Sequence, residues 1–150
     1  MSALTPLQLK RALVEAGFEV FRTRGDEIVL AERVRENLIM DSGVRVRASD
    51  PHEVRIVLRA QRTDYPGDDE VLLFSRVREL ASRAVHAGFV ELSTAVAPVR
   101  DPADDTRTLD TFYEIVFTKI ATSLDNAFEV TRFALGLEKI ASPRKKSVPP

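Results

Sequence analysis

The sequence predicts an α+β fold, a mostly antiparallel sheet of five to six strands with three helices in the order α-β-β-β-β-α-β-β-α. Three observations lead to this fold class. Two helical patterns each end in Ala-Gly-Phe and continue into strand-like residues, at 16–18 and 87–89. The segments between them alternate apolar and polar residues, which is typical of half-buried strands. Every link between successive strands is short, as in antiparallel pairs.

The length and composition are those of one globular domain. The 150 residues are enough to form a hydrophobic core, so we expect a single α+β domain over 1–142. The Pro-rich basic tail, 143–150, is predicted to be disordered. No apolar run approaches the ~20 residues of a membrane span and the N-terminus has no signal-peptide pattern, so we expect a cytoplasmic protein with no membrane contact.

The charge balance argues against one class of partner. The chain has 22 basic and 23 acidic residues, a formal net charge of −1. Nucleic-acid-binding domains are usually strongly basic, so we do not expect nucleic acid among its partners. The chain has no cysteine, which excludes disulfides, thiolate ligands and cysteine nucleophiles.

The first predicted helix covers Thr5–Ala16. Thr5 suits the N-cap, and Pro6 suits the first helical position, where its missing N–H costs nothing. Leu9 and Leu13 fall on one face, and Gly17 is expected to end the helix.

Four strands are expected before the next helix. Residues 18–31 predict a hairpin around Gly25-Asp26, and 44–61 predict two strands about the turn Ser49-Asp50-Pro51. Arg33–Met40 is ambiguous between one helical turn and an irregular strand, and Asp41-Ser42-Gly43 is interpreted as a break. Alternation predicts that one face of the second strand pair is buried. The apolar residues of that face are Val44, Val46, Val54, Ile56, Leu58 and Ala60.

The second half of the chain repeats the helix-then-hairpin pattern. Asp68 or Asp69 is expected to cap a helix that runs to Ala87. A long hairpin follows over 89–120, with an acidic loop between its strands. Thr122 or Ser123 then caps a helix to about Ile140. Apolar residues spread widely around this last helix, so we expect it to pack on the sheet or against a second chain.

The two Ala-Gly-Phe segments are interpreted as helix ends rather than as binding motifs. Gly17 and Gly88 can adopt the left-handed conformation that ends a helix, and Phe18 and Phe89 can fold back over the last turn before starting a strand.

No motif for catalysis or for cofactor binding is present. His52 and His86 lack metal-ligand spacing, and the "MDSGV" segment around Ser42 lacks the G-x-S-x-G pattern. The acidic clusters Asp68-Asp69-Glu70 and Asp101, Asp104, Asp105 do not follow the calcium-loop spacing. Phosphate-binding glycine loops are also absent from the sequence. We therefore expect no catalytic residues, no metal site and no cofactor, and a protein that is not an enzyme.

One group of charged residues has a defined arrangement. Alternation places four arginines on one face of neighbouring strands, namely Arg45, Arg47, Arg55 and Arg59. Two interpretations are open. The long side chains can cover a solvent face and pair with Glu53 and its neighbours. Alternatively, they can contact an acidic protein segment or, with less support, phosphates.

The order of elements resembles the type III secretion chaperone-like fold, a group that includes the bacterial YbjN-type proteins. The resemblance is carried by helix Thr5–Ala16 running through Gly17-Phe18 into a hairpin, helix Asp69–Ala87, hairpin Phe89–Ile120 and the terminal helix. It covers nearly the whole chain as a pattern of elements, without a specific motif. This chain has one more strand around Val44–Gln61 and lacks the acidity common in secretion chaperones. The resemblance implies a small, often dimeric, non-catalytic protein that holds a segment of another protein.

These observations lead to a functional hypothesis. We expect an adaptor or chaperone-like domain, homodimeric through the second helix, the terminal helix or a sheet edge, that binds a segment of a partner protein. Phe128, Phe133 and Leu137 would anchor the partner, and the four arginines would steer an acidic one. The alternative is a ligand- or nucleotide-sensing regulatory domain that holds an anion on the Arg-rich face. An enzyme with dispersed acidic residues comes third.

Overall fold

The computed structural model describes residues 4–143 and confirms the α+β fold class. Within these residues a sheet of seven strands has the order β1-β2-β3-β4-β6-β5, with β7 beside β4. The chain divides into two compact units, Met1–Ile56 with Thr118–Leu137 and Val57–Phe117 with Glu138–Pro150. Strands β4 (Glu53–Gln61) and β6 (Asp104–Ile120) contribute to both units. The single domain over 1–142 stays a prediction, and the predicted disordered tail lies outside the described residues apart from Pro143.

The first unit begins with α1 (Pro6–Glu15), which the sequence predicted closely. Its N-terminus is a capping box. The Gln8 N–H donates to Thr5 Oγ1 (3.2 Å), and the Thr5 N–H donates to Gln8 Oε1 (2.9 Å), so two backbone donors that the helix leaves open are satisfied. Leu9 and Leu13 are fully buried, as their spacing on one helical face requires.

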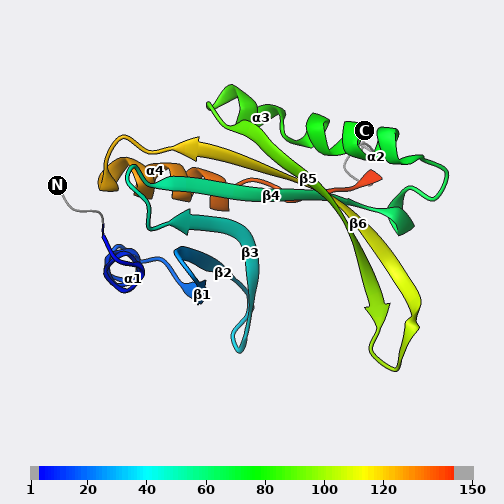
Figure 1. The fold of residues 1–150 in the computed structure, drawn as a ribbon, viewed down its shortest axis with the longest axis horizontal. Helices are drawn as coiled ribbons and strands as arrows, with labels where there is room; N and C mark the ends of the chain where they lie inside the picture. The colour runs from blue at the N-terminus through cyan, green and yellow to red at the C-terminus, as the bar shows by residue number, and fades with distance from the viewer. Residues whose placement is uncertain (1–3, 144–150) are drawn as a thin grey trace. The chain divides into compact units, whose positions relative to one another are not determined.

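Strands β1 (Val20–Arg24), β2 (Glu27–Arg35) and β3 (Leu38–Arg47) continue the first unit (Figure 1). The Gly25-Asp26 hairpin is confirmed. The helical alternative for Arg33–Met40 is wrong, because 33–35 belong to β2 and 38–40 to β3, with Arg33 opposite Ile39 and a turn at 36–37. A break at Asp41-Ser42-Gly43 is also wrong. Strand β3 runs through it as a bulge, in which Gly43 takes a φ of +82° and the extra residues are absorbed without ending the ladder.

The apolar residues that alternate along β3 and β4 are buried, as predicted. All six predicted inward residues, Val44, Val46, Val54, Ile56, Leu58 and Ala60, are fully buried. Residues on β4 alternate between buried and partly exposed along its whole length, which is the pattern of a strand covered on one face.

Helix α4 (Leu124–Leu135) completes the first unit and contacts β3. The Asn126 N–H donates to Ser123 Oγ (3.0 Å), which confirms the Ser123 cap. Its buried residues are Ala127, Val130, Thr131 and Ala134. The predicted end near Ile140 is wrong. Gly136 forms the C-cap because glycine is a poor helix former.

The second unit contains a 3₁₀ turn (Arg62–Asp64), α2 (Glu70–Leu80), α3 (Ser82–His86), β5 (Val90–Asp101) and β7 (Ile140–Ala141). The single predicted helix to Ala87 is divided at Ala81 into α2 and α3. Asp69 caps α2, accepting from the Leu72 N–H (2.8 Å). Strand β7, which the sequence placed in the terminal helix, pairs in parallel with Arg59 and Ala60 of β4.

Both Ala-Gly-Phe segments end helices, as predicted. Gly17 has a φ of +96° and Gly88 a φ of +102°. The Phe18 N–H donates to the Leu13 carbonyl, and the Phe89 N–H to the Ala84 carbonyl, each at 3.0 Å. These are the long hydrogen bonds of the Schellman motif. Among the described residues, no helix combines the length and apolar character that crossing a bilayer requires.

Candidate partner-binding edge of the second unit

The second unit ends in an exposed edge strand. In the described part of the chain, β5 is the outermost strand beside β6, and every residue from 90 to 96 is exposed. Three large aliphatic side chains are among them. Val90 is 60% exposed, Leu92 48% and Val96 46%. An edge strand presents a row of backbone N–H and C=O groups that can pair with another chain.

The two faces of β5 have different surroundings. Glu91 accepts two hydrogen bonds from Arg78 of α2, both at 2.9 Å, so its side of the strand faces the helix. Because successive side chains on a strand point to opposite faces, Val90, Leu92 and Val96 point away from α2. They form the apolar row on the open face of the hairpin.

Strand β6 follows the same division. Tyr113 is buried and packs edge-on against Phe74 of α2, with ring centroids 5.6 Å apart. Its neighbours Phe112 and Glu114 therefore point to the open face, where both meet Arg59. The Arg59 guanidinium lies 4.7 Å from the centre of the Phe112 ring and 2.8 Å from the Glu114 carboxylate.

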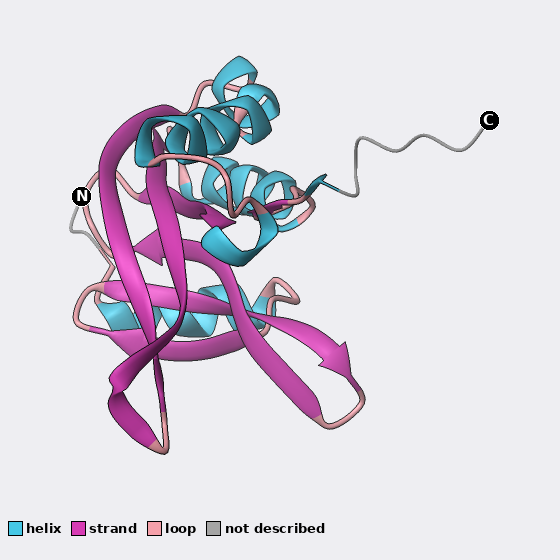
Figure 2. Ribbon diagram, turned by 90° about the vertical axis from the view of Figure 1, so that its right-hand side faces the viewer, coloured by secondary structure: helices cyan, strands magenta, loops and turns pink. Residues whose placement is uncertain are grey.

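The hairpin extends beyond the helices of its own unit. In Figure 1, α2 and α3 lie beside the beginning of β5, while the end of the hairpin that carries the turn between β5 and β6 projects past them. Figure 2, turned by 90°, shows the same two strands running out from beneath the helices. Both faces of this end of the hairpin therefore lie outside the cover that α2 and α3 provide.

The edge strand of the first unit differs from β5 in length and charge. Strand β1 has five residues, and its exposed part carries Arg22 and Arg24. Short edge strands with charged side chains discourage pairing with another chain. Strand β5 has twelve residues, and between Phe89 and Val99 its one charged residue is Glu91, which Arg78 already holds. Of these two edges, β5 is the one suited to accept a further strand.

The acidic tip of the hairpin is a turn structure. Asp101 accepts from the Ala103 N–H (2.9 Å), and Asp104 accepts from the N–H and the hydroxyl of Thr106 (3.1 and 2.6 Å). These hydrogen bonds from Thr106 lower the pKa of Asp104 below its ordinary value. The described residues contain no group of three or more His, Asp or Glu side chains placed to hold a metal ion.

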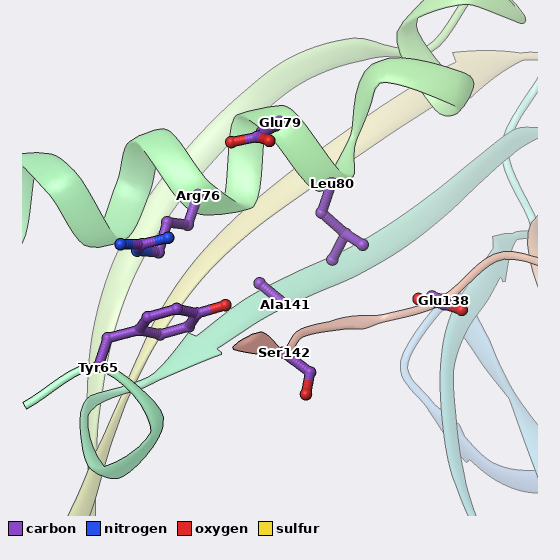
Figure 3. A pocket seen from close by; sticks show the side chains of 7 residues that line it. All are labelled: Tyr65, Arg76, Glu79, Leu80, Glu138, Ala141 and Ser142. Atoms are coloured by element: carbon purple, nitrogen blue, oxygen red, sulfur yellow. The ribbon is translucent and has the colours of Figure 1, made fainter. Parts of the chain in front are cut away.

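A second feature of this unit is a pocket of about 150 Å³ between α2 and β7 (Figure 3). The Arg76 guanidinium lies over the Tyr65 ring, 4.1 Å from its centre, and forms an ion pair with Asp68. Burial raises the pKa of the Tyr65 hydroxyl, against the opposing effect of the Arg76 charge. The remaining lining residues are Glu79, Leu80, Glu138, Ala141 and Ser142. The arginine that could attract an anion here is thus already paired.

The predicted Arg residues are held by carboxylates. Arg45 donates to both oxygens of Asp41 at 2.7 Å. Arg47 bridges Asp26 and Glu53, both at 2.7 Å. The interpretation that these side chains pair with Glu53 is confirmed for Arg47, whereas Arg45 pairs with Asp41 on its own strand.

The last two arginines follow the same pattern. Arg55 lies 3.4 Å from Glu53 and 3.9 Å from Glu27, and Arg59 pairs with Glu114 in the second unit. The contact of the four arginines with an acidic partner stays a prediction. Each would reach such a partner with its charge already offset by an acidic neighbour.

The predicted apolar anchors are half-buried. Phe128 packs on Phe18, with ring centroids 5.9 Å apart, and the Arg132 guanidinium lies 5.2 Å from the centre of the Phe18 ring. Phe133 and Leu137 are also partly covered. Their role in binding a partner stays a prediction.

The sequence interpretation missed the apolar row of β5. The signal was present, because Val90, Leu92 and Val96 recur at even positions of one strand. It could not be assigned to a surface, since the same alternation describes a strand with one face in the core. The protein-family models, the curated proteins and the solved structures searched contain no match to this chain.

Proposed function

We propose that this protein is a non-catalytic protein–protein interaction domain that binds an extended segment of a partner protein as an additional strand on β5. The observation that carries the proposal is the twelve-residue edge strand with its exposed aliphatic row. Strand addition supplies affinity through main-chain hydrogen bonds, and the alternate side chains supply specificity.

The chemistry of β5 defines the segment that fits it. The added strand would lie antiparallel or parallel to β5 and place alternate side chains beside Val90, Leu92 and Val96. A segment with aliphatic or aromatic residues at every second position therefore fits best. Charged residues at those positions would be desolvated against the apolar row without a partner.

The other functional expectations from the sequence are part of this proposal. An adaptor or chaperone-like role, a homodimer and a cytoplasmic location are all compatible with a strand-binding edge, as is the resemblance to type III secretion chaperone-like proteins. The anion-sensing alternative is not supported by a specific observation. A phosphate would have to displace the carboxylates that Arg45, Arg47 and Arg59 already contact.

Photo-crosslinking tests the proposal. A photoreactive amino acid placed at Thr94 in the middle of β5 should cross-link to one short segment, identified by mass spectrometry. The same group at Val14 on α1, which is also exposed (53%), is the control and should not label that segment. A synthetic peptide of the cross-linked segment should bind the wild type and the Val14→Lys variant equally. It should bind Leu92→Lys and Val96→Lys at least about tenfold more weakly, the loss expected when an interface anchor is replaced by a charge.

Two outcomes would contradict the proposal. One is a pattern of cross-links at Thr94 no different from that at Val14. The other is peptide binding that Leu92→Lys and Val96→Lys leave unchanged, because the contact would then lie elsewhere on the chain.

A further inference from the structure

We infer that the strand which pairs with β5 is β5 of a second copy of this chain, antiparallel about a two-fold axis at Thr94. This inference rests on the proposed function, and it names the partner of the same edge. It is carried by the symmetry of the residues on either side of Thr94 and by the absence of opposing charge among them.

The sequence of β5 is nearly symmetric in side-chain size about Thr94. Small residues, Ser93 and Ala95, flank it on the helix side. On the open face, Leu92 and Val96 lie two residues away in opposite directions. A two-fold axis through Thr94 therefore places each Leu92 opposite the Val96 of the other copy. A self-complementary patch of this kind is what an isologous interface requires.

The geometry of a continuous sheet limits the possible registers. A two-fold axis perpendicular to the sheet keeps each face on the same side in both copies, so even-numbered residues must lie opposite even-numbered ones. The axis must then lie midway between the two copies of one residue, so that this residue is opposite itself. We compare the four centres nearest the middle of β5 on the side of the aliphatic row, namely Ser93, Thr94, Ala95 and Val96.

Charge and apolar contact separate these four registers. An axis at Val96 would put Glu91 opposite Asp101 twice, and like charges directly opposite are destabilising. An axis at Ala95 would put Val90 opposite Arg100, so that an aliphatic side chain would face a charged one instead of an apolar partner.

The two remaining centres differ in how the aliphatic row is matched. An axis at Ser93 would put Leu92 opposite Thr94. The Thr94 axis pairs Leu92 with Val96 twice and places Val90 against the ring of Pro98. It is the register that matches every member of the row with an apolar side chain.

Pro98 gives the pairing a natural end. It has no N–H, and proline within a sheet suits the outward side of an edge strand. Thr94 lies four residues earlier and presents its backbone groups to the same side. The two Thr94 residues can then exchange both N–H···O bonds, and the ladder ends where Pro98 lacks a donor. Glu91, held by Arg78, lies opposite Ala97 and meets no like charge.

Cysteine substitution gives a direct test, because the chain has no native cysteine. Residues directly opposite in an antiparallel pair have Cα atoms about 4.5–5.5 Å apart, within the range that a disulfide spans. Thr94→Cys should therefore form a covalent dimer rapidly under mild oxidation. Ser93→Cys and Val96→Cys are the matched controls. Their two copies are offset along the strands and should cross-link far more slowly.

Light scattering provides the second measurement. The wild type and Val14→Lys should both form a dimer. Val96→Lys, which places a lysine opposite each Leu92, should raise the dimer dissociation constant at least about tenfold. Circular dichroism and thermal unfolding should show that every variant is folded, because the substituted side chains are exposed.

The possible results separate this inference from the proposed function. Faster cross-linking of Val96→Cys or Ser93→Cys than of Thr94→Cys overturns the register. A wild-type chain that is monomeric up to high concentration, with no Thr94→Cys dimer, overturns the inference. If the photoreactive group at Thr94 then labels a segment of a different protein, the proposed function stands without it. If that label is absent too, both fail.

Discussion

Replacing Arg47 by methionine tests whether the arginine face stabilises the fold or contacts a partner. Arg47 lies on β3, where its guanidinium contacts Asp26 and Glu53, both at 2.7 Å. Methionine keeps the apolar stem of the side chain and removes only the charge and its donors. If the ion pairs are the role of Arg47, the variant should lose stability and keep its assembly.

The expected loss follows from the exposure of the two carboxylates. The Asp26 side chain is 48% exposed, so water replaces Arg47 there and the loss is about 0.2–1 kcal/mol. Glu53 is 19% exposed and keeps the Thr118 hydroxyl at 3.0 Å. A hydrogen bond to such a charged group is worth about 1.5–3 kcal/mol, and the remaining partners place the loss at the lower end. The total is about 2 kcal/mol, or a fall in Tm of about 4–8 °C for a chain of this size.

Acid should reduce this difference. The Arg47 hydrogen bond is the main cause that lowers the pKa of Asp26 below its ordinary value of 3.8. Burial acts to raise the pKa of Glu53, but the hydrogen bonds from Thr118 and Arg47, together with the charges of Arg55 and Arg47, outweigh it and hold this pKa below 4.5. Groups with a lowered folded-state pKa contribute stability above their unfolded pKa and lose it as the pH falls through the folded value. The gap between wild type and variant should therefore be full at pH 7 and shrink below about pH 4.

Urea unfolding at several pH values measures this gap. Asp26→Asn is the control, since it removes only the exposed arm and should cost about 0.2–1 kcal/mol. An Arg47→Met variant with the same free energy of unfolding as the wild type would refute the reasoning. A difference in this free energy that stays the same at acidic pH would also refute it. If the variant kept its stability but lost its dimer or partner, Arg47 would be a contact residue.

Three further predictions concern the ends of helices and the pocket. Gly17→Ala should lower the free energy of unfolding by about 1–2 kcal/mol in a urea titration, because alanine is strained at the positive φ of this position. Gly136→Ala is the control and should not change the free energy of unfolding, because Gly136 has an ordinary helical φ and an added Cβ would meet no close contact. Asp69→Ala should lower the Tm, since losing an N-cap costs about 1 kcal/mol; an unchanged Tm would show that the cap contributes nothing. In a variant whose other tyrosine is phenylalanine, the absorbance of Tyr65 should report a pKa of its hydroxyl above the ordinary value of 10.0. Arg76→Gln should raise this pKa further, because it removes a positive charge. A lower pKa in the Arg76→Gln variant would contradict the role given to Arg76.

The parts of the fold that local sequence determines were predictable. A helix N-cap requires one side chain within three residues of the first turn, so Thr5 and Ser123 could be identified by type and spacing. Glycine is the residue that adopts a positive φ at little cost, so Gly17 and Gly88 marked both helix ends. The inward face of β4 followed from a period of two.

The features that depend on distant partners were not predictable. Residues 33–40 combine good helix formers with Val34 and Ile39, which favour strands. Residues 33–35 and 38–40 form strands because β2 and β3 supply each other with hydrogen bonds. Ile140 and Ala141 form β7 because β4 offers an open edge beside Arg59. The exposure of Val90, Leu92 and Val96 follows from their place on the face turned away from α2 and from the edge position of β5 in the strand order. That order is a property of the whole sheet, and no local pattern of residues contains it.

The two proposals together require that dimer formation and capture of a partner segment compete, because both use the outward backbone groups of β5. A chain in the dimer has no free edge, so its apparent dissociation constant for a segment is the intrinsic value divided by the fraction of chains with a free edge. Well above the dimer dissociation constant, this fraction falls as the inverse square root of total protein, so a hundredfold rise in protein should weaken apparent binding about tenfold. A synthetic peptide of residues 89–99 is a suitable probe. The oxidised Thr94→Cys dimer should not bind it, and reduction should restore binding; equal binding before and after reduction would show that the segment and the second copy use different surfaces.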